Sequence, residues 1–208
     1  MDQPTDDRQS DAPGPPNRPP DIQTSLSVGA DGALRWSVLS RPPQGEAGTA
    51  HAARALVEYL NRRGQGWNLP TPPSGRESGV DQVATGPLGE LRMQVTRVPT
   101  DEAYYRRLGH QGHVAASSTI GELAEDLIAG IRHKAHRGQE SLNVDRTLVL
   151  DAESSIAHGL LQVLDEFDMQ YHAEAAAAGF REIWLVTAMH VHRLIPGEWK
   201  ESSDEHVA

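Results

Sequence analysis

The sequence predicts an α/β fold in which a mixed central sheet is flanked by helices. Residues 146–152 and 182–188 are continuous apolar runs, RTLVLDA and EIWLVTA, as central parallel strands that are buried on both faces require. Upstream, residues 80–98 alternate between apolar and polar side chains around a Gly/Pro-containing turn, which is typical of a β-hairpin. Strands that first follow one another and then alternate with helices favour a mixed sheet covered by helices.

The first forty residues are predicted to form a tail and a β-hairpin that precede the main domain. Residues 1–22 are rich in Pro and Asp and have almost no apolar side chains, so we expect a disordered tail. Residues 23–40 contain two short alternating runs around Gly-Ala-Asp-Gly, which predicts a separate N-terminal β-hairpin. At the other end, residues 197–208 are predicted to form an acidic tail.

Between these ends, residues 48–196 are predicted to form one α/β domain. A helix begins at Gly48-Thr49 and ends at Gly64, and the segment 67–69 is a short strand candidate. After the hairpin we expect a short helix from Thr100 to Leu108. A longer helix then opens at Ser117 or Ser118 and runs to about Arg137, with its apolar residues at helical spacing.

The C-terminal part of the domain adds further elements to the sheet and its helices. The first apolar strand is followed by two predicted helices, at 156–164 and 168–178, and the second is predicted to continue to Pro196. The predicted order from residue 48 is therefore α-β-β-β-α-β-α-β.

Composition restricts the function classes. The 208 residues carry a formal net charge of −10, with a pI of about 5.4, and contain no cysteine. Disulfides, thiolate catalysis and cysteine-ligated metal sites are therefore excluded. The acidic excess lies towards the two ends, whereas residues 51–138 are slightly basic. Because no apolar run is long enough to span a bilayer and the first residues do not resemble a signal peptide, we expect a cytoplasmic protein without a membrane partner.

The hairpin at 80–98 has the most informative polar pattern. Counting outward from its turn puts Asp81 opposite Gln94, and Gln94 shares one strand face with Arg92 and Thr96. An acid that faces a polar-x-polar step on the neighbouring strand is an arrangement that metal-dependent nucleases use. The same pattern also suits the solvent face of an amphipathic hairpin.

The order of elements, together with the positions of Asp81 and Gln94, resembles the PD-(D/E)xK nuclease superfamily, which has the restriction-endonuclease-like fold. The resemblance covers residues 50–152, and the α-β that follows would be an addition to the α-β-β-β-α-β core. It implies metal-dependent cleavage of phosphodiester bonds in DNA or RNA, with nucleic acid as the partner and Mg²⁺ (or Mn²⁺) as the cofactor.

The resemblance also implies roles for individual residues. Asp81, the Gln94 side chain and the Val95 carbonyl would hold the ion. Thr96 takes the position of the family's catalytic lysine, and Glu58 takes that of the helix-one glutamate found in some members.

The pattern departs from the family at two positions. Gln94 keeps an oxygen ligand but removes one negative charge, and Thr96 removes the ammonium group that offsets negative charge in the transition state. Lys134, near the end of the long helix, or Arg92, on the same strand face, would have to replace it. A motif shifted by two residues, Glu90-x-Arg92, is an alternative that keeps both an acid and a cation.

Two principal functions remain open at this stage. The chain is either a nuclease or an inactive nuclease-fold subunit that contacts a protein partner in a larger assembly, so whether it is an enzyme is uncertain. A nucleic-acid mimic, suggested by the net charge, ranks third. Three histidine pairs, at 110/113, 133/136 and 190/192, offer two imidazoles each, whereas a zinc site usually needs three or four protein ligands.

Overall fold

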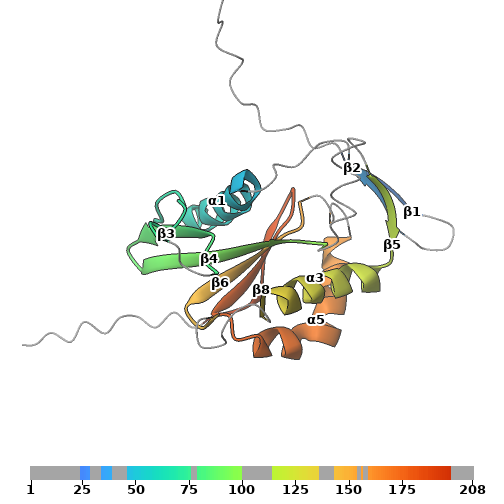
Figure 1. Cartoon of the computed structure of the whole chain (residues 1–208). Coiled ribbons are helices and arrows are strands. Elements are labelled where there is room, and N and C mark those ends of the chain that lie inside the picture. Colours follow the sequence, from blue (N-terminus) through green and yellow to red (C-terminus); the bar gives the residue numbers. More distant parts are fainter. Residues whose placement is uncertain are drawn as a thin grey trace, which may run out of the picture.

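The chain folds as a three-layer α/β structure (Figure 1). The computed structural model describes residues 24–28, 34–38, 46–75, 79–99, 114–135, 143–153, 156 and 159–197. A five-stranded mixed sheet forms the middle layer, with α1 on one face and α3 and α5 on the other. The predicted α/β class and the mixed sheet are confirmed.

The sheet has the strand order β3-β4-β6-β7-β8. Three central strands, β4, β6 and β7, run parallel to one another, and the edge strands β3 and β8 are antiparallel to their neighbours. Every residue of β6 and β7 is buried, as their apolar sequences predict. The bounds of the strands are β3 Gln82–Gly86, β4 Gly89–Arg97, β6 Arg146–Asp151, β7 Glu182–Val186 and β8 Val191–Ile195.

Each face of the sheet has its own apolar core. The helix α1 (Glu46–Arg62) packs on the face that carries Leu91, Met93, Val95 and Val149. The helices α3 (Ile120–Ala135) and α5 (Leu160–Ala177) cover the opposite face, where Val98, Leu148 and Leu150 lie among others. Alternating residues of a strand point to opposite faces, so β4 sends its apolar odd-numbered side chains towards α1.

The start of α3 differs from the prediction by one or two residues. Residues Val114–Ser118 form the strand β5, which pairs with β2 (Leu34–Val38) beside β1 (Thr24–Val28) in a second, three-stranded sheet. Thr119 therefore caps the helix. Its hydroxyl accepts the Glu122 amide at 3.2 Å, and the Glu122 carboxylate accepts the Thr119 amide at 2.6 Å, which is a reciprocal capping box.

Two predicted helices in the C-terminal half are wrong as separate elements. A single helix, α5, runs through the predicted break and keeps Val163, Leu164 and Phe167 buried on one side. The acidic residues between them lie on the outer side of the same helix, so they do not interrupt it.

The predicted strand at 67–69 is also absent. Only Thr71 forms an isolated antiparallel β-bridge, with Val83 of β3. Prolines at positions 70, 72 and 73 surround it and have no amide hydrogen to donate to a ladder.

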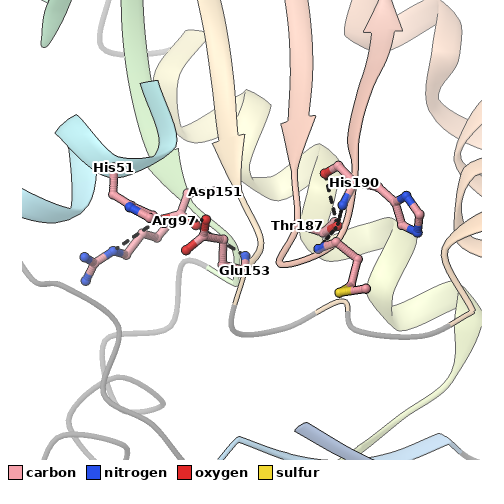
Figure 2. A network of polar contacts seen from close by, with 7 residues as sticks. His51, Arg97, Asp151, Glu153, Thr187 and His190 are labelled. Carbon is pink, nitrogen blue, oxygen red and sulfur yellow. Dashed lines mark hydrogen bonds and ion pairs between the residues drawn. The ribbon is translucent and has the colours of Figure 1, made fainter. Parts of the chain in front are cut away.

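The second apolar strand is shorter than predicted because the chain reverses after Val186. The Thr187 hydroxyl accepts the backbone amide of His190 at 3.0 Å and stabilises this turn, and Figure 2 shows the two residues at the end of β7. The chain then returns as the antiparallel strand β8. The predicted helix at 100–108 and both predicted tails lie outside the described residues. Within the described ranges, the helices lack the length and apolar character needed to cross a membrane.

Candidate functional site

The hairpin β3–β4 has the register that the sequence predicts. Gln82 pairs with Met93, so Asp81, the residue directly before β3, falls opposite Gln94. The Asp81 side chain forms a hydrogen bond within the hairpin, because its Oδ2 accepts the backbone amide of Val95 at 2.8 Å. The carboxylate therefore serves as a hydrogen-bond acceptor within the strand pair.

Thr96, which the resemblance to the nucleases would align with their lysine, is packed under α3. It is only 8% exposed, and a Cβ atom added to Gly130 of α3 would lie 3.7 Å from its methyl group. The same Cβ would lie 3.1 Å from Cγ2 of Val98, so helix and strand are in close contact here. The hydroxyl group is consequently not presented to an open cleft.

Gln94 is 5% exposed and lies near a buried cation. Both the Gln94 side chain and the Arg146 guanidinium lie next to Gly79. A Cβ atom added to Gly79 would lie 3.5 Å from Nε2 of Gln94 and 3.2 Å from Cζ of Arg146. Arg146, the first residue of β6, is itself 4% exposed. Within the described part of the chain, the Oε1 atom of Gln94 has no hydrogen-bond partner.

This donor set does not fit a Mg²⁺ ion. The ion is usually held by one or two carboxylates together with waters in octahedral geometry. Here one oxygen of the Asp81 carboxylate already accepts an amide, the second ligand is a neutral amide, and the Arg146 guanidinium lies close to that amide. Among the described residues, no group of three or more His, Asp or Glu side chains is arranged to hold a metal ion.

The other predicted participants are distributed around this hairpin. Arg92 forms an ion pair with Glu90, whose Oε2 lies 3.4 Å from Nε of Arg92. Lys134 is partly exposed in the last turn of α3, four residues after Gly130 and therefore on the same helix face. Glu58 is exposed on α1, and the sheet separates that helix from the face that carries Thr96. Glu58 and Thr96 thus lie on opposite sides of the sheet.

A second polar cluster lies at the carboxyl ends of β4 and β6 (Figure 2). Arg97 ends β4 and Asp151 ends β6, and the two are neighbours in the parallel register. Nε of Arg97 lies 3.6 Å from Oδ2 of Asp151, and Nε2 of His51, on α1, lies 3.0 Å from the Glu153 carboxylate. Oδ1 of Asp151 accepts the Glu153 amide at 3.3 Å, which connects the two pairs into one cluster.

Burial changes the acid–base properties of this cluster. Desolvation raises the pKa of Asp151 to about 6, with a further contribution from the neighbouring Glu153 carboxylate, while Arg97 and His51 partly oppose the shift. The hydrogen bond to Glu153 raises the pKa of His51 above its ordinary value. The Asp151 carboxyl therefore keeps its proton to a higher pH than an ordinary aspartate does.

Sequence reasoning did not identify this second cluster. The sequence does place the acids of Asp151-Ala-Glu153 at the end of a buried strand. Open α/β sheets often bind ligands at the carboxyl ends of their parallel strands, so these two acids could have been chosen as candidates from the sequence. The contribution of His51 had no signal, because the contact depends on how α1 lies across the sheet.

The histidine pairs form no recognisable centre where the structure describes them. His190 and His192 are exposed around the start of β8, and His133 is exposed on α3. His110, His113 and His136 lie outside the described residues. No family model, curated protein or solved structure matches this chain.

Proposed function

We propose that this chain is a homologue of the PD-(D/E)xK nucleases that no longer cleaves nucleic acid and works as a binding subunit. The relationship is supported by the element order: α1 precedes an antiparallel hairpin, and α3 connects its second strand to the parallel strand β6. Thr71, which precedes β3 in the sequence, forms a β-bridge with Val83 of β3. The first strand of the nuclease fold would pair with the second at this position.

One observation carries the loss of catalysis. The hydrogen bond from the Val95 amide to Oδ2 of Asp81 gives the motif's acid a structural role, and α3 packs over Thr96. A nuclease of this class needs its acid open to a metal ion and a cation beside the attacking water. Here the acid is used within the hairpin, and a threonine methyl group is packed at the lysine position.

An active nuclease is the second candidate, and the position of Lys134 favours it. Because α3 connects two parallel strands, it runs opposite to β4, so one helical turn beyond Gly130 leads from Thr96 towards Gln94. The Lys134 ammonium would then approach the motif from the helix. In that case Asp81 would exchange its contact with the Val95 amide for a metal ion when substrate binds.

Substitutions of Asp81 distinguish a structural acid from a metal ligand. Asp81→Ala leaves the Val95 amide without its acceptor, so we expect the free energy of unfolding to fall by about 1–3 kcal/mol. Asp81→Asn keeps an acceptor oxygen, so its free energy of unfolding is expected to fall by less than that of Asp81→Ala. Urea denaturation measures both effects, and calorimetric titration with Mn²⁺ is expected to detect no one-to-one site in the wild type.

The opposite pattern would overturn the proposal. Stoichiometric Mn²⁺ binding by the wild type that disappears in Asp81→Asn would identify the carboxylate as a metal ligand. Asp165→Asn is a suitable control for the titration, because Asp165 is an exposed acid on α5 and belongs to neither version of the motif.

A further inference from the structure

A cleft of about 360 Å³ opens between the C-terminal half of α1 and the strands β7 and β8. Its lining includes two arginines and two aromatic residues: Tyr59 from α1, Arg63 from the turn directly after α1, Trp184 from β7 and Arg193 from β8. It lies on the α1 face of the sheet, whereas Gln94 and Thr96 lie on the opposite face. Its volume is within the range of small-molecule sites, roughly 300–1,000 Å³.

The four side chains form one continuous array. The guanidinium carbon of Arg63 lies 4.7 Å from the centre of the Tyr59 ring. That ring meets Trp184 edge to face, with 5.7 Å between ring centres and an interplanar angle of 66°. The guanidinium carbon of Arg193 lies 5.7 Å from the Trp184 ring on the β8 side. Each arginine is thus held against an aromatic ring, and the two rings are in contact with each other.

These two arginines differ from others on the surface. Arg97 and Arg132 form ion pairs with Asp151 and Glu174. Within the described ranges, by contrast, neither Arg63 nor Arg193 has a carboxylate within ion-pair distance.

The acid that lines the cleft, Glu182, has a structural role. It is 1% exposed and accepts the indole N–H of Trp184 at 2.7 Å, which fixes the orientation of that ring. The carboxylate therefore lies beneath the surface that a ligand would meet, whereas the two guanidinium groups and the His192 side chain are exposed in the cleft.

A guanidinium group that lies against an aromatic ring keeps its N–H donors available in its plane and exposes its outer face. The donors suit the oxygens of a phosphate, and the planar face suits stacking with a nucleobase. We propose that this cleft binds a nucleotide, either free or within a single strand, through Arg63 and Arg193. This names a ligand for the binding subunit proposed above and rests on that function for its biological role.

Binding measured without divalent metal tests the assignment separately from the nuclease question. The probes are AMP and a fluorescein-labelled single-stranded deoxythymidine dodecamer, titrated in EDTA at low salt and followed by calorimetry and anisotropy. We expect at least one of them to bind. Arg63→Gln and Arg193→Gln are each expected to weaken binding by about tenfold or more, because each removes a charge-assisted hydrogen bond.

Arg62→Gln is the matched control, because Arg62 is the exposed neighbour of Arg63 and does not line the cleft. It removes the same charge and is expected to change the dissociation constant less than twofold. Arg63→Lys keeps the charge but loses the planar face, so it is expected to weaken binding as well. Binding of AMP alone would identify a free nucleotide as the ligand, and binding of the dodecamer alone would identify a single strand.

Two results would overturn the inference. One is the absence of binding by both probes, and the other is binding that Arg63→Gln, Arg193→Gln and Arg62→Gln weaken equally, which would indicate general attraction to charge. Neither result bears on whether Asp81 is a metal ligand, so failure here is distinguishable from failure of the proposed loss of catalysis.

Discussion

Replacing Asp151 with asparagine is expected to raise the free energy of unfolding above pH 6 and to flatten its dependence on pH. The folded-state pKa of Asp151 is about 6, whereas its ordinary pKa, which represents the unfolded chain, is 3.8. Below pH 3.8 the Asp151 carboxyl is protonated in both the folded and the unfolded state, so its ionisation does not affect the free energy of unfolding. Between pH 3.8 and 6 the unfolded chain releases a proton that the folded protein retains, so stability falls over this range and reaches its lower level once the buried carboxyl ionises near pH 6. The shift corresponds to about 3 kcal/mol.

The neighbouring histidine acts in the same direction. The pKa of His51 is raised by Glu153, so its stabilising charge is present below its unfolded value of 6.5 and is lost as the pH rises through the folded value. Both groups therefore make the wild type less stable on the alkaline side of neutrality. In Asp151→Asn only the contribution of His51 remains, although the ion pair with Arg97 is also removed.

Urea denaturation at pH 4.5 and pH 7.5 measures this effect. The expected result is a smaller difference in unfolding free energy between the two pH values for Asp151→Asn than for the wild type. Asp165→Asn is the control, because Asp165 is exposed on α5 and its substitution should leave the difference unchanged. An unchanged difference in Asp151→Asn would contradict the burial of an ionised Asp151.

Replacing Gly130 with leucine is expected to lower the free energy of unfolding by about 1–3 kcal/mol. Even a Cβ atom at this position would lie 3.1 Å from Val98 and 3.5 Å from Leu150, so the larger side chain has no space between α3 and β4. Because leucine has a higher helix propensity than glycine, the substitution should stabilise the helix itself. A lower free energy of unfolding would therefore result from the poorer packing between α3 and β4.

The control for this substitution lies in the same helix. A Cβ atom at Gly121 would meet nothing closer than 4.0 Å, so Gly121→Ala is expected to be neutral or to stabilise by up to about 1 kcal/mol. Unchanged stability in Gly130→Leu would mean that α3 can move away from β4. Thr96 and Gln94 would then be accessible, which would contradict the buried motif on which the proposed loss of catalysis rests.

The sequence predicts elements whose own residues determine them. The strands β6 and β7 carry apolar runs at their centres and are buried along their whole length, and the pairing of Asp81 with Gln94 follows from counting outward from one turn. The length of α5 and the turn at Thr187 were not predicted. In each case, burial by other elements or a side-chain hydrogen bond outweighs the local pattern.

The two sites depend still more on tertiary contacts. The position of Gly130 above Thr96 and the hydrogen bond between Asp81 and the Val95 amide require coordinates, because sequence spacing does not specify how a helix crosses a strand. The contact between His51 and Glu153 joins α1 to the end of β6. The arginine–aromatic array draws on α1, β7 and β8, and none of these segments carries the pattern alone.

The proposed loss of nuclease activity is tested by the length of a nucleic acid after incubation with the protein. End-labelled single-stranded DNA, duplex DNA and RNA would each be incubated with stoichiometric protein and Mn²⁺, and their lengths compared on a denaturing gel. We predict that all three remain intact. Shortened products that require Mn²⁺ and disappear with both Asp81→Asn and Lys134→Ala would instead identify an active nuclease that uses the helix lysine.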